Sequence, residues 1–238
     1  MIEILLQMAA IAACGVLWGR FAPAGLAAEP TRRAISGVVY YLLLPALVLR
    51  VLWQAPIGVA SLQIAVAAAS GVLVGLALQW TMCRMCSMDR AATGALLLAA
   101  AFPNATYLGL PVLEGVLGEW ARSVAIQYDL FACTPLLLTL GIAIAQRHGE
   151  GAMRQGPVRR LLTVPAIWAA VAAVSLNLSN VQAGDWLLEL LDQLAVTVVP
   201  LMLISVGMVL RLDVLRSRLM GSALSVPVMQ LLLMPLGV

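Results

Sequence analysis

The chain has 238 residues, of which 63% are hydrophobic and only 11% are charged, and its formal net charge is +3. Soluble domains carry roughly 25% charged residues, so this composition excludes a soluble globular protein and indicates a membrane protein. All fourteen cationic residues are Arg, and their distribution bears on topology.

Eight apolar runs are long enough, at roughly 17 to 25 residues, to cross a bilayer as helices. They predict an all-α integral membrane protein with spans near residues 4–22, 33–52, 59–82, 92–117, 121–145, 160–179, 186–210 and 219–238. The first cation, Arg20, follows the first run, which indicates a retained span rather than a cleaved signal peptide. No linker or long loop interrupts the series, so we expect one membrane domain.

Arginine placement predicts the orientation of these spans. Twelve arginines fall in the loops after spans one, three, five and seven, and only Arg50 and Arg122 lie on the other side. Because cytosolic loops are enriched in Lys and Arg, we expect a multi-pass protein of the cytoplasmic (inner) membrane with its N-terminus outside. The arginines are then assigned to topology and contact with the lipid bilayer, and no nucleic-acid partner is expected.

The cysteines form one pair with a recognisable spacing. Cys83 and Cys86 make a C-x-x-C, which can serve redox chemistry or half of a zinc site. No second pair follows, and the one histidine, His148, lies in a distant loop. We expect reduced thiols, no bound metal and no cofactor.

Two similar segments suggest an internal repeat. "YYLLLPALVLRVL" (40–52) and "AVTVVPLMLISVG" (195–207) align with Pro45 on Pro200, an offset of 155 residues. Helices separated by five spans run in opposite directions, so the alignment predicts two inverted five-helix repeats, as in many transporters. We assign 1–145 to the first repeat, 146–159 to a cytosolic loop and 160–238 to an incomplete second repeat. Chance alignment of two Leu- and Val-rich helices is the alternative.

The repeat also bears on completeness. The counterpart of the fourth span falls near residue 259, beyond the final Val238. We therefore expect this sequence to be a fragment that holds eight of ten spans and lacks the ninth and tenth.

The fourth span contains helix-breaking residues in the stretch "AFPNATYLGLP" (101–111). Pro103 and Pro111 lack N–H donors, and Gly109 permits dihedral angles that other residues resist. In hydrocarbon, unwound backbone is tolerated only where protein buries it or water reaches it. The stretch predicts a discontinuous helix that forms a binding site, with a simple proline kink as the alternative.

At these residues the chain resembles a known family. "FPNATYLGLPVL" is similar to the F-x-N-x-x-(F/Y)-x-G-L-P-(L/V) signature of the auxin efflux carrier family, which includes PIN-type auxin carriers and bacterial malonate permease relatives. "LWGRF", "VVYYLLLPALVLRVL" and "VVPLMLISVGMVLRLDVL" resemble its first, second and seventh spans. The resemblance implies ten spans in two inverted repeats, with broken fourth and ninth helices that cross at a central site. It also implies that the second and seventh spans, which contain Pro45 and Pro200, belong to a scaffold that can form a homodimer.

The resemblance places the substrate site on the crossover. It falls on Asn104 to Pro111, where Asn104 matches the motif asparagine and Pro111 the crossover proline, and the stretch includes Thr106, Tyr107 and Gly109. Independently, an asparagine amide beside unwound backbone offers donors and an acceptor to a carboxylate, and half-helix N-termini add partial positive charge. The expected substrate is a small organic anion.

The fifth span adds an intramembrane carboxylate in "IQYDLFACTP". Asp129 lies about eight residues from the outer end, or roughly 12 Å at 1.5 Å per residue, which is close to mid-membrane. We expect either a site for a coupled proton or cation such as sodium, or a protonated structural carboxyl bonded to Gln127, Tyr128 or a neighbouring helix.

The functional hypothesis is a secondary transporter, a permease working by alternating access. Malonate or other dicarboxylate uptake is the alternative to auxin-like efflux, and a channel or receptor is the alternative class. A membrane enzyme would need a convergent nucleophile or metal set, which the sequence does not offer, so we expect no enzyme activity.

Overall fold

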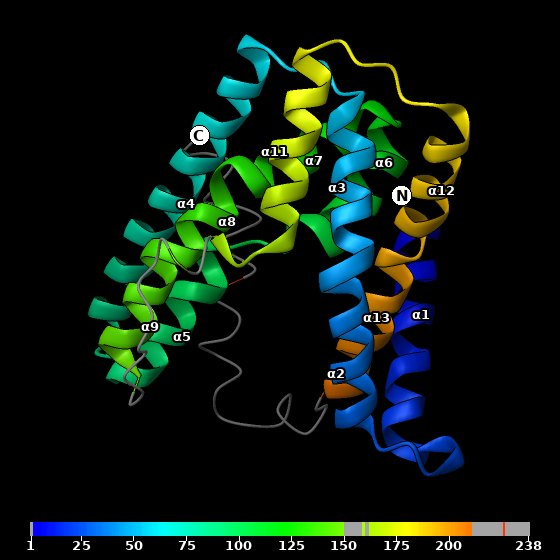
Figure 1. The fold of residues 1–238 in the computed structure, drawn as a ribbon. Helices are drawn as coiled ribbons and strands as arrows, with labels where there is room; N and C mark the ends of the chain where they lie inside the picture. Colours follow the sequence, from blue (N-terminus) through cyan, green and yellow to red (C-terminus); the bar gives the residue numbers. More distant parts are fainter. Residues whose placement is uncertain (1, 150–158, 160–161, 211–225, 227–238) are drawn as a thin grey trace. The chain divides into compact units, whose positions relative to one another are not determined.

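Long apolar segments fold as helices in a membrane, because only a helix satisfies every backbone N–H and C=O group within one segment. The computed structural model describes residues 2–149, 159, 162–210 and 226, and the regular structure within them is helical (Figure 1). Five helices in this part of the chain are long and apolar enough to cross a membrane, and a sixth if one broken pair counts as a single span. The prediction of an all-α membrane protein is confirmed.

Most predicted spans correspond to helices or to end-to-end series of helical segments. In chain order these are α1 (Ile2–Phe21), α2 (Ala28–Val38) with η2 (Val39–Leu43) and α3 (Leu44–Trp53), then α4 (Val59–Met85). The fourth span comprises α5 (Arg90–Ala101), η3 (Ala105–Gly109) and α6 (Leu110–Leu117). The fifth comprises α7 (Trp120–Tyr128), η4 (Asp129–Cys133), α8 (Thr134–Leu136), η5 (Leu137–Gly141) and α9 (Ile142–His148). The seventh comprises α12 (Asp185–Val196) and α13 (Val198–Val209), and a short 3-10 helix, η1 (Pro23–Gly25), follows α1.

The sixth span starts later than the sequence pattern indicates. Its helix, α11 (Pro165–Leu178), has 14 residues, whereas the predicted span begins at residue 160. Val164 is extended, with φ −82° and ψ 112°, because the ring of a following proline disfavours helical geometry at the residue before it. The predicted eighth span, 219–238, lies outside the described residues apart from Val226.

The chain divides into two compact units. Unit 1 contains residues 1–58, 105–126 and 164–211, and unit 2 contains residues 59–104, 127–163 and 212–238. The chain passes between the units within the fourth span, after Asn104, and within the fifth span, after Ile126. The units therefore do not follow the boundary between the two predicted repeats.

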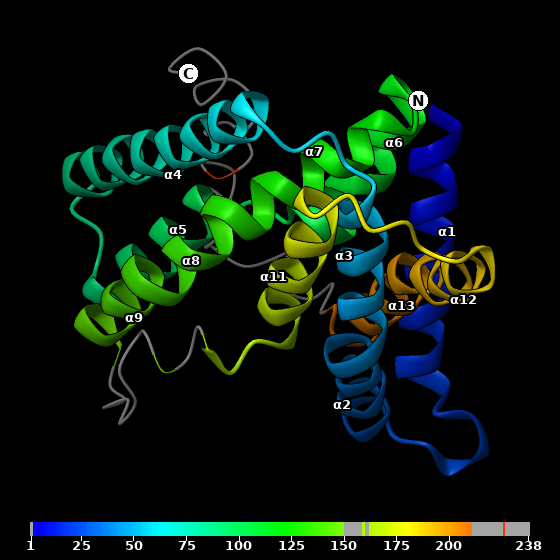
Figure 2. The ribbon, with the colours of Figure 1, turned by 45° about the horizontal axis from the view of Figure 1, so that its top comes forward.

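In unit 1, α1 packs along α13 (Figures 1 and 2). A Cβ built on Gly15 of α1 would lie 3.0 Å from Gly207 Cα of α13, and one built on Gly19 would lie 3.0 Å from the carbonyl oxygen of Met208. Gly15 and Gly19 form a G-x-x-x-G pair, the spacing that puts small residues on one helix face and lets two backbones approach closely. The buried serine Ser205 extends the interface of α13 to α2, where its hydroxyl lies 3.0 Å from that of Ser36.

The second helix pair of unit 1 joins α3 to α11. Here α11 buries only alanines, Ala166, Ala170 and Ala173, against the larger side chains of its neighbour. Asn177 at the end of α11 donates to the carbonyls of Leu52 (3.3 Å), Trp53 (2.7 Å) and Ala55 (2.8 Å). Because the last carbonyls of a helix lack intrahelical donors, this one amide caps the end of α3.

In unit 2, α4 packs against α5 and η4, and α5 also packs against α9. The buried residues at the centre are Val72, Ala101 and Cys133, one from each of the third, fourth and fifth spans. Gly94 of α5 adjoins His148 of α9 so closely that an added Cβ would overlap the histidine side chain. Unit 2 thus holds the third span, the first half of the fourth and most of the fifth around one core.

Three of the four π-helical segments in the described residues end two residues before a proline. η2, η3 and η4 precede Pro45, Pro111 and Pro135, respectively. Proline removes the N–H that would bond the carbonyl four residues earlier, and its ring crowds that carbonyl. In a π turn the bonds run over five residues, as from Thr134 N–H to the carbonyl of Asp129, so the helix continues past the proline.

Candidate functional site

The fourth span is interrupted at residues 102–104, where the predicted discontinuity lies. Helix α5 ends at Ala101, Phe102 is extended with φ −111° and ψ 94°, and helical structure resumes at Ala105. Phe102 precedes Pro103, and a residue before proline favours this extended conformation. The two pieces together are long and apolar enough to form one broken membrane span.

The second predicted break does not occur. We expected unwinding at Gly109 and Pro111 as well, but residues 105–117 are continuously helical, as η3 followed by α6. Pro111 lies in the first turn of α6, directly after the π-helical segment, where its missing N–H is tolerated. The interruption is therefore three residues long, at Phe102, Pro103 and Asn104, and does not extend to Pro111.

The predicted crossover residues are distributed over the two units. Asn104 is exposed and is the last residue of unit 2 before the chain enters unit 1. In unit 1, Thr106 is buried, whereas Tyr107 and Gly109 are half-buried on η3. Asn104 immediately precedes the first residue of η3, the position at which Asn is favoured because its side chain can accept from free helical N–H groups.

Asp129 lies in a π-helical turn of unit 2. It is half-buried and begins η4, and the Thr134 hydroxyl donates a hydrogen bond of 3.1 Å to its Oδ1. π turns inside α-helices are frequent at functional sites, because the extra residue redirects a side chain. Its two neighbours differ in environment, with Gln127 fully buried and Tyr128 half-buried and packed on the core of unit 2. These contacts are compatible with either role weighed for Asp129.

A pocket of unit 1, which we call the charged pocket, has a volume of about 490 Å³. Its five charged lining residues come from α3, α6, α12 and the α6–α7 turn with the start of α7: Arg50, Glu114, Glu119, Arg122 and Asp192. Pro111, from the predicted crossover, also lines it. The turn between α6 and α7 is tight because Gly118 has φ 95°, a conformation that other residues rarely adopt, and it places Glu119 and Arg122 at the rim.

Both arginines of the charged pocket have acidic neighbours. Arg50 Nε lies 2.9 Å from Asp192 Oδ1, and Arg122 Nε lies 3.5 Å from Glu114 Oε2. Both Nε atoms are buried, and neither makes a hydrogen bond within the described part of the chain. The two contacts are therefore ion pairs without hydrogen-bond geometry. Arg50 also donates to Gln54 Oε1 at 2.6 Å.

The pocket joins the two arginines that are exceptions to the topology pattern. Among the described residues, two cations and three carboxylates line it, which is a formal charge of −1, so acidic neighbours already offset the charges of Arg50 and Arg122. Sequence reasoning missed this pocket because Arg50 and Asp192 are 142 positions apart. The available signal was that these two arginines alone fall outside the loops predicted to be cytosolic.

The remaining predicted residues occupy structural positions. Pro45 and Pro200 both lie in unit 1, in the first turns of α3 and α13. Among the described cysteines, Cys83 is buried, Cys86 is exposed, and both are free thiols.

The fold and site define a multi-pass helical membrane protein with one interrupted span. Residues 1–238 match the model of a protein family described as "Membrane transport protein". A relative from Methanothermobacter thermautotrophicus, named "Uncharacterized transporter", is 29% identical over 216 residues, covering 89% of this chain and 69% of its own length. The chain belongs to the membrane transport protein family, the auxin efflux carrier family of its sequence motifs.

Proposed function

We propose that this protein is a secondary transporter that moves a small organic anion across the cytoplasmic membrane by alternating access. The observation that carries the proposal is the interruption at residues 102–104, in the middle of an otherwise apolar span. An unwound segment exposes backbone groups that lipid cannot satisfy, so it is retained where a polar ligand or water replaces them. In secondary transporters such broken helices form the substrate site.

Helix pairing in unit 1 supports the inverted repeat. Under the offset of 155 residues, span one corresponds to span six and span two to span seven. The pairing of α1 with α13 then corresponds to the pairing of α11 with α3, and both pairs are present. The helices also deviate at corresponding positions, since a π segment precedes Pro45 and a break at Thr197 precedes Pro200. These pairings support the proposed repeat in addition to the sequence alignment.

The chemistry at the interruption favours an anion. The first N–H groups of a helix have no acceptor within that helix, and the helix dipole makes this end, here at Ala105, partially positive. Asn104 adds an amide that can donate to a carboxylate. In this proposal Asn104, Thr106 and Tyr107 contact the substrate, and Asp129 carries a coupled proton or binds sodium.

The interrupted fourth span and the predicted inverted repeat favour alternating access over a channel, because broken helices in inverted repeats are typical of secondary transporters. A channel remains the second candidate, and linear flux beyond millimolar substrate would favour it, because a carrier saturates.

The proposal is tested by separating Asn104 from Asp129. In full-length protein reconstituted in liposomes, Asn104→Ala should weaken the binding of a transported organic acid three-fold to a hundred-fold at every pH. The loss is of hydrogen bonds, worth about 0.5 to 3 kcal/mol, and involves no titrating group. Asp129→Asn keeps the size of the side chain and removes its titration, so binding should persist while transport loses its pH dependence. Affinity and flux are measured from pH 5 to 8.

Matched variants distinguish these roles from general effects. Asp185→Asn removes an exposed carboxylate at the start of α12 and should leave both affinity and pH profile unchanged. Asn104→Asp puts a negative charge at the proposed contact and should weaken anion binding more than Asn104→Ala does. Unchanged affinity in both Asn104 variants would exclude this residue from the site. A parental pH profile in Asp129→Asn would assign Asp129 a structural role.

A further inference from the structure

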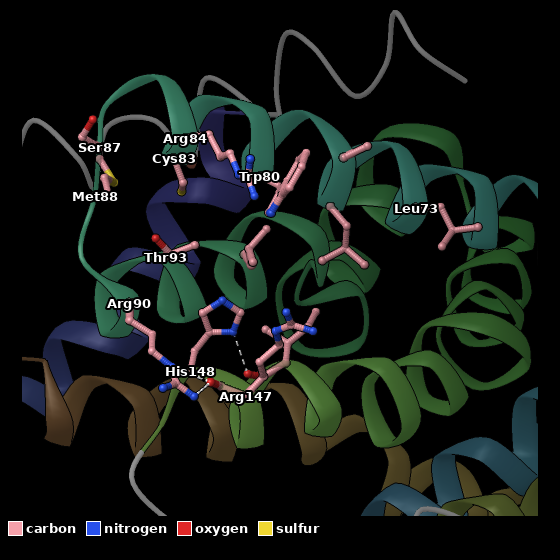
Figure 3. Close-up of a pocket in the computed structure, with 14 residues that line it drawn as sticks. Leu73, Trp80, Cys83, Arg84, Ser87, Met88, Arg90, Thr93, Arg147 and His148 are labelled. Carbon is pink, nitrogen blue, oxygen red and sulfur yellow. Dashed lines mark hydrogen bonds between the residues drawn. The ribbon is translucent and has the colours of Figure 1, made fainter.

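Unit 2 contains a second cavity, which we call the basic groove, that the proposed transport site does not use. Its volume is about 890 Å³, and it lies where three helices meet at one end of the unit: the C-terminal part of α4, the start of α5 and the end of α9 (Figure 3). Neither Asn104 nor Asp129 lines it. The basic groove is therefore a candidate binding site separate from the proposed transport site.

The lining of the basic groove is amphipathic. Its apolar part extends along the helices and comprises Leu73, Leu76, Ala77, Trp80, Leu97 and Ile144. Its polar part gathers at the helix ends and comprises Arg84, Arg90, Arg147 and His148 with the hydroxyls of Ser87 and Thr93. Among the described residues, three arginines line the cavity and no acidic residue does, so these lining residues carry a formal charge of +3 with His148 neutral.

Local contacts hold the basic side chains around the cavity. The Arg84 guanidinium carbon lies 4.5 Å from the centre of the Trp80 ring, a cation–π arrangement. Arg90 donates through Nε to the backbone carbonyl of Arg147 at 2.6 Å, which joins the start of α5 to the end of α9. His148 Nδ1 lies 3.0 Å from the carbonyl of Ile144 and must carry the proton it donates, which leaves Nε2 for another partner. Figure 3 shows Arg84 on one wall and Arg90, Arg147 and His148 on the opposite wall.

This combination fits a lipid better than a soluble anion. A soluble anion needs the arginines but gains nothing from six apolar lining residues. A phospholipid places an anionic head group among cations at the membrane surface and its acyl chains along apolar helix surfaces. Basic pockets between membrane helices on the cytosolic side bind such head groups, and tryptophan is enriched at this depth. Arg84, Arg90 and Arg147 all belong to loops predicted to be cytosolic.

We propose that the basic groove binds an anionic phospholipid of the leaflet predicted to face the cytosol, with the phosphate between Arg84 and Arg147 and an acyl chain along Leu73 and Leu76. The bound lipid would join α4 to α9 within unit 2, because its head group contacts the ends of both helices. This site is independent of the substrate, so it can be tested without knowing what the protein transports.

The test measures lipid retention by native mass spectrometry of the full-length protein. Phosphatidylglycerol should be retained in preference to phosphatidylcholine. The double variant Arg84→Gln/Arg147→Gln should weaken phosphatidylglycerol binding about thirty-fold. Each arginine near an anionic head group contributes roughly a fivefold increase in affinity, and the two factors multiply. The control is Arg32→Gln/Arg33→Gln, which removes two arginines predicted to lie on the same side but outside the groove, and it should retain the lipid.

Further variants keep the test decisive if the double variant folds poorly. Arg84→Lys/Arg147→Lys keeps the charge and should preserve most of the binding, whereas Ser87→Glu adds a carboxylate at the rim without removing an arginine and should weaken it. An equal loss in the groove and control variants would overturn the proposal, because general surface charge would explain the preference. Displacement of the lipid by millimolar inorganic phosphate would also overturn it, because the site would then bind a free anion.

Discussion

The contact between α1 and α13 leads to a quantitative prediction about a single methyl group. In Gly15→Ala, the new Cβ would overlap the carbonyl oxygen of Ile204 and lie 2.9 Å from its carbonyl carbon and 3.0 Å from Gly207 Cα. All three are backbone atoms, so no side chain can rotate to make room. The two helices must separate, and overpacking of this kind costs about 1 to 3 kcal/mol.

The control for this variant is Gly37→Ala in α2, where a Cβ meets nothing within 4 Å. Replacing a helical glycine by alanine gains up to about 1 kcal/mol from propensity, and both variants share this gain. The difference between them therefore isolates the steric cost. At about 2 to 4 °C per kcal/mol for a protein of this size, Gly15→Ala should melt roughly 2 to 12 °C below Gly37→Ala.

The assay is thermal unfolding of the purified protein in detergent, followed by size-exclusion chromatography with fluorescence detection. Gly207→Ala should behave like Gly15→Ala, because its Cβ would overlap the carbonyl oxygen of Ala12. One separation of α1 from α13 relieves both clashes, so the double variant should cost clearly less than the sum of the two. Equal melting temperatures for Gly15→Ala and Gly37→Ala would refute the close-packed interface.

Two further predictions concern unit 1. Asn177→Ala removes the side-chain donor to three carbonyls at and just after the end of α3, which should cost about 1 to 2 kcal/mol of stability. The melting temperature should therefore fall by roughly 2 to 8 °C in the same assay. An unchanged melting temperature would mean that water replaces the amide. Asp192→Asn should change the melting temperature by less than about 3 °C, because its ion pair with Arg50 is partly exposed. It also takes the charged pocket from −1 to neutral, so the apparent KM for an anionic substrate should fall by up to about fivefold. An unchanged KM would exclude the pocket from the transport path.

The spans could be predicted from the sequence because their cause is local. An apolar run of about twenty residues has no alternative to a helix in hydrocarbon, and proline and glycine mark where that helix can fail. The sequence pattern therefore located most of the spans and the interruption at residues 102–104. It misjudged the start of the sixth span because Leu161, Leu162 and Val164 extend the apolar pattern, while Pro165 forces Val164 out of the helix.

The charged pocket and the basic groove could not be predicted in the same way. Each joins residues from several helices, and no local pattern relates Arg50 to Asp192 or Arg84 to Arg147. Before the structure, these arginines had a sufficient explanation in topology and contact with the bilayer. Tertiary packing adds that they line cavities with specific neighbours. The structure also limits the interruption to residues 102–104, whereas the sequence predicted breaks at both Pro103 and Pro111.

The difference between Pro103 and Pro111 shows why the interruption is short. Both prolines lack an N–H and crowd the preceding turn, so each could unwind the span. A π-helical segment precedes Pro111, as it does Pro45 and Pro135, and at each of these three prolines the helix continues. No such segment precedes Pro103, and there the chain becomes extended at Phe102 and restarts after Asn104. A π turn keeps the carbonyls before a proline bonded within the helix, whereas an extended residue leaves backbone groups for other partners. Of the two prolines in the fourth span, only Pro103 lies in the interruption, beside Asn104. If the proposed substrate site lies there, variants at Asn104 should alter substrate affinity more than variants at Pro111.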